Sequence, residues 1–291
     1  MAKEHFFLAE NDAHLKLLDE AARRASVSRG QAFDDFLHMA VTALSGGAME
    51  REYLGVVGKY SAGQPGKRGI DSLCELFAGI VAASETTRDD IRDVLGDLFE
   101  GGISYGEAGQ YLTPMPICRL NAQVLVGGEA ESADDTPVGE LNPPTEATLP
   151  APDREPKSVY DPACGSGRML LAVAELHRDW TLVGRDVDLR CVQMTCLNLA
   201  LRNLYGYVLH GNSLKDEVKL VYRTGLNARG GVIRYGSVRE LNEKFGTISE
   251  SDVSTEPVAP CSPDTGITSP AATTKTSSPP DPRPGKQLRL F

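Results

Sequence analysis

The sequence lacks the cysteine spacing that a structural zinc site or a disulfide framework requires. None of its six cysteines forms a CxxC pair or lies at ligand spacing from a histidine, so we predict no metal site. Free thiols are typical of a reducing compartment, which favours the cytoplasm. The six residues are Cys74, Cys118, Cys164, Cys191, Cys196 and Cys261.

Long apolar runs are missing as well. No stretch of 18 uninterrupted apolar residues occurs, and the first twenty residues mix charged with apolar side chains. This pattern predicts no membrane-spanning helix, no signal peptide and no membrane partner. Apolar residues still make up 41% of the 291 residues, which is enough for one or two packed domains.

Positive charge is scarce, because the formal net charge is −10 and the isoelectric point is about 5.1. Such a chain repels a phosphate backbone, so we expect weak DNA binding by the chain alone. Any DNA contact then needs a local basic patch or a partner.

Proline divides the chain into folded and unfolded parts. Fourteen of the 18 prolines lie in residues 127–157 and 247–291, which are also poor in aromatic and β-branched runs. Neither segment buries enough apolar area to offset the entropy of ordering it. We predict an acidic linker over 127–157 and a disordered tail over 247–291.

Residues 1–126 have the pattern of an all-helical domain. The apolar stripe in Gln31–Leu44 recurs at helical spacing and predicts a core-facing helix. A second helix is expected from Thr87, which with Asp90 approximates a capping box, and Gly101 and Gly102 are expected to end it.

Residues 158–246 alternate between strand and helix patterns and predict an α/β, Rossmann-like core. Val218–Tyr222 and Gly231–Tyr235 are candidates to complete a small sheet. The expected elements before them are a strand at Ser158–Tyr160, a helix at 168–177, a strand at 181–186, a helix at 189–203 and a strand at 207–210.

A glycine loop, Asp161–Gly167, connects the first strand to its helix. Glycines there let the backbone approach a ligand, and this is the ligand crevice of an open α/β sheet. Asp161 is placed to accept a hydrogen bond from an ammonium group. Asp186 ends the next strand, where a carboxylate binds ribose hydroxyls; the alternative is an ordinary loop acid. Arg168 follows the loop and either orients it or meets phosphate.

These segments resemble the adenine-N6 DNA methyltransferases of type I restriction-modification systems. The sequence DPACGSGRMLL from Asp161 looks like that family's cofactor motif. Asp93–Glu100 is similar to the end of its helical domain. Gly109–Pro114 (GQYLTP) resembles its GQ(F/Y)(F/Y)TP motif, with Leu112 in place of the second aromatic. Gly184–Asp188 and Gly211–Leu214 resemble its ribose-binding and adenine-binding segments.

The resemblance implies a class I methyltransferase core that binds S-adenosylmethionine and acts on adenine in DNA. Asn212 replaces the family's more usual aspartate, and its side chain still accepts a hydrogen bond from the adenine amino group. A second subunit that supplies target recognition is a further implied partner. The implied cofactor contacts are Tyr111, Thr113, Pro114, Asp161, Pro162, Ala163, Gly165, Ser166, Gly167, Asp186 and Asn212.

The family's catalytic tetrapeptide, (N/D)PP(Y/F), is missing after Leu214. Asn142–Pro144 is followed by Thr145 inside the linker, which suggests a coincidence. About 33 residues separate Leu214 from the tail, too few for the four further strands of a full sheet, so we predict a shortened core. No catalytic residue is assigned.

Three functions remain open. The first is an active adenine methyltransferase that takes its base-binding group from an unrecognised element or from a partner. Alternatively it is a non-catalytic, regulatory S-adenosylmethionine-binding relative. The third alternative is a binding module that no longer needs the cofactor, which the intact glycine loop argues against.

The carboxyl-terminal pentapeptide, Gln287–Phe291 (QLRLF), resembles the QL(S/D)LF motif by which bacterial proteins bind the DNA-polymerase sliding clamp. Its apolar side chains suit a cleft on a partner, and a flexible tether lets the motif search for it. The alternative is a chance apolar end. The expected clamp contacts are Gln287, Leu288, Leu290 and Phe291.

Overall fold

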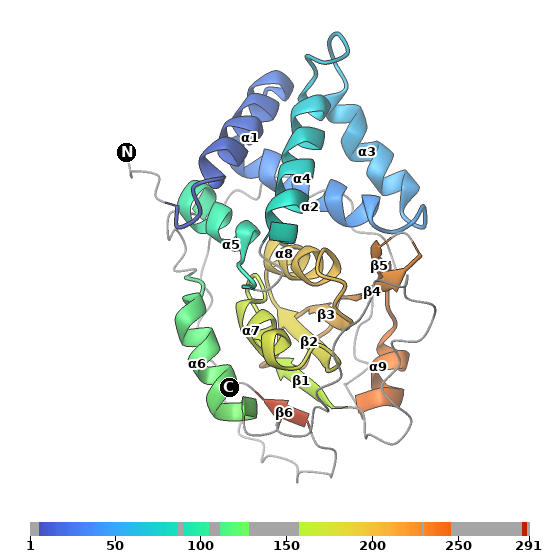
Figure 1. Ribbon diagram of the computed structural model, residues 1–291. Helices are drawn as coiled ribbons and strands as arrows, with labels where there is room; N and C mark the ends of the chain where they lie inside the picture. Colours follow the sequence, from blue (N-terminus) through green and yellow to red (C-terminus); the bar gives the residue numbers. More distant parts are fainter. Residues whose placement is uncertain are drawn as a thin grey trace, which may run out of the picture.

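The computed structural model describes residues 6–86, 90–104, 111–127, 157–228, 230–245 and 287–289. A helical layer lies above an α/β layer (Figure 1). In the described parts of the chain, no helix is long and apolar enough to cross a membrane.

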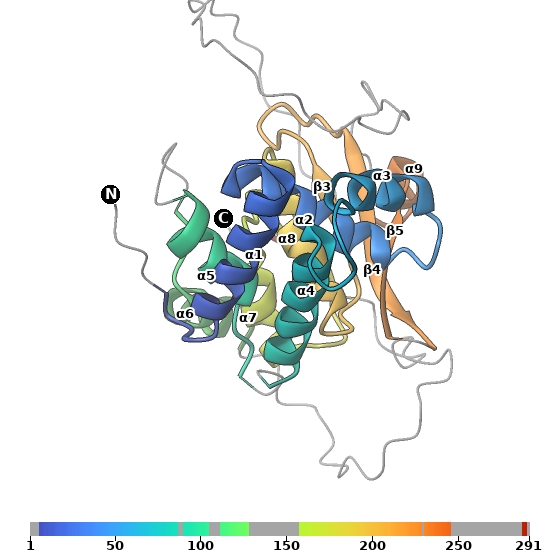
Figure 2. The ribbon, with the colours of Figure 1, turned by 90° about the horizontal axis from the view of Figure 1, so that it is seen from above.

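The helical layer is formed by α1 to α5, and Figure 2 looks down on it. The predicted core helix is confirmed as α2, where the Ser28 side chain accepts a hydrogen bond from the Gln31 amide and caps the first turn. Helix α1 packs along α4. The bounds are α1 Asn11–Ala25, α2 Arg29–Ala43, α3 Glu50–Tyr60, α4 Gly69–Thr86, α5 Val94–Phe99, the π-helix η1 Glu100–Ser104 and α6 Met115–Val126.

The helix that we expected from Thr87 begins later, at Val94. Its cap is Asp93, whose carboxylate accepts a hydrogen bond from the Gly96 amide at 2.8 Å. Nor do Gly101 and Gly102 end a helix, because the chain continues through them as η1. A Cβ at Gly102 would lie 2.8 Å from the Leu15 side chain, so this glycine serves close packing against α1.

The α/β layer is one sheet with strand order β5-β4-β3-β2-β1-β6. Strands β1, β2 and β3 are parallel to one another, as expected for two successive β-α-β units. The two candidate segments do complete the sheet, as the strands β4 and β5 of a hairpin, and β4 runs antiparallel to β3. The bounds are β1 Ser158–Asp161, α7 Arg168–Leu176, β2 Thr181–Asp186, α8 Leu189–Ala200, β3 Gly206–His210, β4 Leu220–Asn227, β5 Gly230–Tyr235 and α9 Val238–Phe245.

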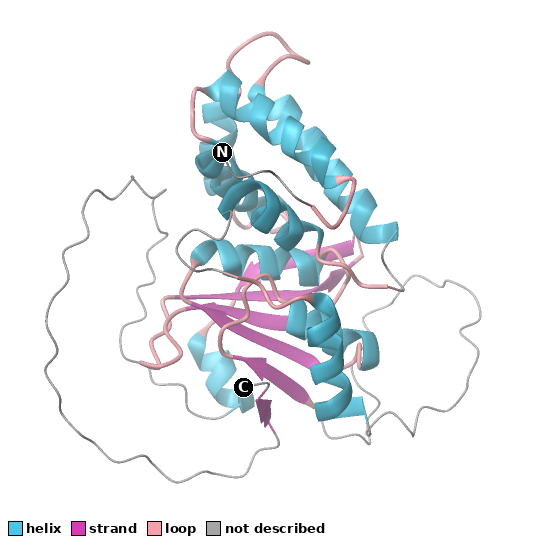
Figure 3. Cartoon of the chain, turned by 90° about the vertical axis from the view of Figure 1, so that its left-hand side faces the viewer, coloured by secondary structure: helices cyan, strands magenta, loops and turns pink. Residues whose placement is uncertain are grey.

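Strand β6, Gln287–Arg289, lies parallel to β1 at the edge of the sheet (Figure 3). Ser158 pairs with Gln287 and Tyr160 with Arg289. The sequence predicts a disordered tail through this point, whereas the structure places these three residues in the sheet. The free edge of β1 offers the unpaired backbone groups that attract such a strand.

One apolar core joins the two layers. Helix α8 packs against α2 on one side and against the sheet on the other, and residues 191–200 are all buried. The same core cluster contains Phe33 and Leu37 of α2 together with Leu197 of α8. On the opposite face of the sheet, Val238 and Leu241 of α9 cover a smaller cluster. The helical layer and the α/β layer therefore share one apolar core.

The Asp93 carboxylate connects the layers through polar contacts. Its side chain is 1% exposed and accepts four hydrogen bonds. Besides the Gly96 amide, the donors are the Ser166 hydroxyl, the Arg168 Nε at 2.8 Å and the Asn198 Nδ2 at 2.7 Å. These three come from the glycine loop, α7 and α8. A single buried carboxylate thus fixes the start of α5 against the loop.

We predict that Asp93→Ala lowers the free energy of unfolding by about 3–5 kcal/mol, because it leaves the buried Arg168 without this partner. Urea denaturation followed by circular dichroism measures the loss. The matched control is Asp90→Ala, since Asp90 makes ion pairs only on the surface. That control should cost less than about 1 kcal/mol, and equal losses in the two variants would contradict the role of Asp93.

Candidate functional site

The glycine loop lies where β1 ends and α7 begins. Asp161 is the last residue of β1, and Asp186 is the last residue of the neighbouring parallel strand β2. Both carboxylates therefore lie at the carboxyl edge of the sheet, the edge at which open α/β sheets bind ligands. The sequence prediction that these two acids flank one loop is consistent with this placement.

Two glycines give the loop its shape. Gly165 and Gly167 have φ of +55° and +89°, in the left-handed region that side chains rarely adopt. A Cβ at Gly165 would lie 2.7 Å from the Leu112 side chain, and one at Gly167 would lie 3.1 Å from Thr195. The loop thus passes under Leu112 with no room for a larger residue.

Hydrogen bonds to neighbouring elements hold the loop. The Cys164 amide donates to the Arg185 carbonyl at 2.9 Å, and the Gly165 amide donates to Asp186 Oδ2 at 2.9 Å. From α8, the Thr195 hydroxyl donates to the Gly165 carbonyl at 2.8 Å. The Asn198 side chain donates through Nδ2 to the Ser166 carbonyl at 2.9 Å. A rigid, preorganised loop costs less entropy when a ligand binds.

Asp161 is a buried carboxylate next to the glycine loop. Its exposed fraction is 2%, and its Oδ1 accepts a hydrogen bond from the Ala163 amide at 3.1 Å. Burial, together with the nearby negative charge of Asp186, raises the pKa of Asp161 to about 6. Within the described residues Asp161 makes no ion pair. A ligand ammonium group would supply the missing positive charge.

Asp186 is half-buried, and burial raises the pKa of this carboxyl as well. Its Oδ1 accepts a hydrogen bond from the Asp188 amide at 2.9 Å, while Oδ2 accepts from Gly165. A carboxylate has about four lone-pair positions. Hydroxyl donors of a ligand could use a lone-pair position that these backbone amides leave open.

The segment Tyr111–Pro114 lies over the loop through Leu112. The Leu112 amide donates to Glu100 Oε1 at 2.9 Å, which ties this segment to η1. The Tyr111 side chain is 79% exposed, and Thr113 and Pro114 are exposed too. The residue in contact with the loop is thus Leu112, which the motif comparison had treated as a departure. Gly109 and Gln110 lie outside the described residues.

Arg168 resolves one of the alternatives left by the sequence. Its guanidinium is 9% exposed and makes ion pairs with Asp93 and with Glu100, both at 2.8 Å. Nη1 also lies 3.5 Å from the Leu112 and Thr113 carbonyls. With these partners the guanidinium orients the loop and the segment above it, and it is not free to meet phosphate.

Asn212 follows β3 at the same edge of the sheet. Its Oδ1 accepts hydrogen bonds from the Leu214 amide at 2.9 Å and from the Lys215 amide at 3.2 Å. The side-chain oxygen expected to accept from adenine is therefore engaged in a local turn. Its preceding Gly211 amide donates to the Asp186 carbonyl at 2.9 Å, which keeps the two strand ends together.

The remaining loop residues and the tail motif have simple placements. Pro162 is half-buried and Ala163 is exposed, whereas the Ser166 side chain is buried against Asp93. Gln287 and Leu288 lie in β6, and Leu290 and Phe291 lie outside the described residues. In the part of the chain with described placement, no group of three acids, cysteines or histidines is arranged to hold a metal.

The sheet departs from a full doubly wound order after β3. In the order 3-2-1-4-5-6 the fourth strand crosses over to lie beside the first. Here β4 turns back antiparallel to β3, and the place beside β1 holds β6. Across the described ranges, no strand from residues 215–245 reaches that side of β1. Asn142–Pro144 lies outside those ranges.

Sequence reasoning missed Asp93, Thr195 and Asn198. The last two lie one turn apart on α8, are at most 1% exposed, and both point to the loop through the contacts given above. Buried polar side chains in an otherwise apolar helix require hydrogen-bond partners, and this was the available signal. No local pattern marks the contact of Asp93 with the loop, because three of its four hydrogen-bond donors lie 73 to 105 residues away.

Known proteins resemble the chain over part of its length. Residues 90–223 match the model of the N-6 DNA methylase family, and no curated protein matches the chain at a significant level. A solved structure from Listeria monocytogenes, described as a class I S-adenosylmethionine-dependent methyltransferase, has a TM-score of 0.40 and 16% identity. The alignment covers 84% of this chain and 65% of that one.

A second solved structure is the methyltransferase subunit of a type I restriction-modification system from Streptococcus thermophilus, with a TM-score of 0.36 and 13% identity. This alignment covers 72% of the chain and 59% of the Streptococcus protein. The chain therefore spans less than two thirds of the length of each of the two solved structures. The family match contains Asp93, the glycine loop and Asp186. Over residues 90–223, somewhat less than half of its length, the chain is similar to the N-6 DNA methylase family.

Proposed function

We propose that the chain binds S-adenosylmethionine in the crevice between Asp161 and Asp186. The observation that carries the proposal is the glycine loop flanked by these two acids at the ends of adjacent parallel strands. The chemistry of the residues fits the cofactor. Asp161 suits its ammonium group, Asp186 suits the two ribose hydroxyls, and the loop admits close approach of the backbone. When bound, the cofactor supplies an electrophilic methyl group.

We further propose that the chain acts in DNA modification and receives its base-binding group from elsewhere. Transfer to adenine N6 needs acceptors for the amino group and an aromatic ring that stacks on the flipped base. The family match supports DNA as the substrate class. The missing tetrapeptide and the course of β4 support a cofactor-binding chain that does not methylate adenine by itself, with a second subunit supplying target recognition.

Isothermal calorimetry with S-adenosylmethionine tests the proposal. Asp186→Ala removes a charged hydrogen-bond acceptor, so we expect the dissociation constant to rise by about 10-fold to 150-fold, or about 1.5–3 kcal/mol. Asp179→Ala is the matched control, because Asp179 lies exposed in the turn before β2, at the opposite end of that strand. Circular dichroism confirms folding. An unchanged affinity in Asp186→Ala, or no binding by the parent protein, rules out this site.

The raised pKa of Asp161 predicts how binding depends on pH. Below about pH 6 the free carboxyl is protonated, so binding of an ammonium group must first release that proton. Affinity therefore rises with pH and levels off above about pH 6, with binding about tenfold weaker at pH 5 than at pH 7. Below pH 6 the calorimetric enthalpy should also vary with the buffer, since the released proton is taken up by it.

Asp161→Asn provides the control for this pH profile. It should bind weakly and with a flat profile between pH 5 and pH 7, because the titrating group is gone. A variant that keeps the pH dependence of the parent would show that another group controls binding.

The tail motif supports a second proposal, recruitment to replicating DNA through the sliding clamp. QLRLF combines two leucines and a phenylalanine with a glutamine, which suits an apolar cleft rimmed by hydrogen-bonding groups. Because Gln287–Arg289 pairs with β1, clamp binding requires release of β6 from the sheet. Docking on a partner would also compensate for the weak affinity of an acidic chain for phosphate.

Surface plasmon resonance on immobilised bacterial clamp tests this second proposal. The tail peptide should bind, a peptide with Leu290→Ala and Phe291→Ala should not, and the full chain should bind more weakly than the peptide because β6 must first leave β1. Equal responses from the two peptides would end the clamp proposal.

A further inference from the structure

The described region after β3 gathers positive charge in an otherwise acidic protein. Between residues 219 and 245, the described residues include five lysines and arginines against two glutamates, while the chain as a whole carries a net charge of −10. This region consists of the β4–β5 hairpin and α9, which form the edge of the sheet opposite β6. A local basic patch of this kind is what an acidic protein needs in order to contact an anionic partner.

Two arginines lie directly opposite each other in the hairpin. Arg223 of β4 pairs in register with Arg234 of β5, so both side chains leave the same face of the sheet. Like charges at opposed positions destabilise a hairpin. Glu240 of α9 compensates Arg223 at 2.9 Å, whereas the exposed Arg234 makes no ion pair with any residue that the structure describes. The hairpin therefore carries one unneutralised guanidinium beside a second.

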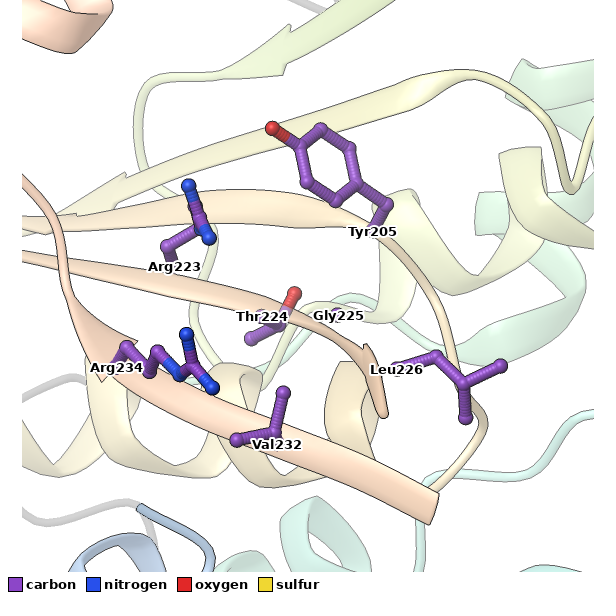
Figure 4. Close-up of a pocket in the computed structure, with 7 residues that line it drawn as sticks. All are labelled: Tyr205, Arg223, Thr224, Gly225, Leu226, Val232 and Arg234. Atoms are coloured by element: carbon purple, nitrogen blue, oxygen red, sulfur yellow. The ribbon is translucent and has the colours of Figure 1, made fainter. Parts of the chain in front are cut away.

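These arginines line a cavity of about 150 Å³ (Figure 4). That volume is roughly ten times the ~15 Å³ needed to hold one water molecule. Tyr205 and Val232 form other parts of its wall. Behind Tyr205, Lys244 of α9 donates to the tyrosine hydroxyl at 2.7 Å, which brings a further positive charge to the same side.

Gly225 keeps the cavity open. It lies in the interior of β4, where glycine weakens a strand unless close approach of a ligand or another backbone requires it. A Cβ there would meet only the Tyr205 ring, at an ordinary 3.7 Å, and its φ is not in the left-handed region. Neither packing nor backbone geometry explains the glycine, and its effect is to leave space beside the two arginines.

We propose that this cavity binds a phosphodiester group of a nucleic acid backbone. Guanidinium groups match the geometry of phosphate oxygens and donate to them in pairs. The inference deepens the proposed role in DNA modification and rests on DNA being the substrate. The cavity lies toward the end of the sheet opposite the cofactor crevice, because Gly206, the first residue of β3, pairs with Thr224. The contact therefore positions the backbone and reads no bases.

Fluorescence anisotropy with a labelled 20-base-pair duplex tests this inference on the full chain. Arg234→Gln should weaken binding about tenfold at low salt. It should also make the slope of log K against log salt shallower by about 0.9, the value for one lost phosphate contact. Arg51→Gln on α3 is the matched control, since Arg51 is also exposed and lies on another element. Gly225→Val fills the cavity with its charges kept, and should weaken binding as Arg234→Gln does.

Loss of affinity in Arg234→Gln and Gly225→Val, with Arg51→Gln unchanged, supports the inference. Two results overturn it: no DNA binding by the parent, or the same affinity in Arg234→Gln as in Arg51→Gln. Cofactor calorimetry on the same preparations keeps the two proposals apart. An Arg234→Gln protein that loses DNA but binds S-adenosylmethionine normally supports both, and a parent that binds DNA but no cofactor refutes only the cofactor site.

Discussion

The Asp93 carboxylate is the constraint on which the remaining structure depends. Burying an ionised acid is costly unless donors replace the lost water, and here four donors from four elements do so. Because Ser166 and Arg168 are among them, the position of α5 and the shape of the glycine loop are set together. Arg168 extends the connection to Glu100 and so to the segment above the loop. The helical layer therefore shapes the ligand crevice and does not merely lie beside it.

The parts of this fold that the sequence predicts depend on residues close together in the chain, and the parts that it does not predict depend on contacts between distant residues. The glycine loop, Asp161 and Asp186 follow from a strand, a turn and a helix that are adjacent in the sequence, and their placement agreed with the pattern. The predicted start of α5 was wrong because the Thr87–Asp90 pair was taken as the cap. The cap is Asp93, which is held by contacts with residues more than 70 positions away. The antiparallel turn of β4 has no local signal either, since both directions bury the same apolar residues.

The sheet is the first half of a doubly wound fold with a hairpin in place of the second half. In a complete fold the strand beside β1 forms the other wall of the ligand crevice. Here three residues of the tail hold that place by pairing with β1. A three-residue edge strand such as β6 is short enough to be exchanged for another strand. Such an exchange would release the tail motif and would place a different strand beside β1, where a complete fold has the other wall of the crevice.

Charge is divided between the two ends of the sheet in a way that suits two ligands of opposite sign. S-adenosylmethionine carries a sulfonium and an ammonium group against one carboxylate, and the crevice at the carboxyl edge presents two acids with raised pKa values. Those same acids would repel DNA. The basic hairpin lies at the far edge and toward the opposite end, where it is separated from them by the width of the sheet. At physiological salt, charges more than about 8 Å apart on the surface are largely screened. An overall charge of −10 is therefore compatible with a local contact to phosphate, because each ligand responds to the charges nearest to it.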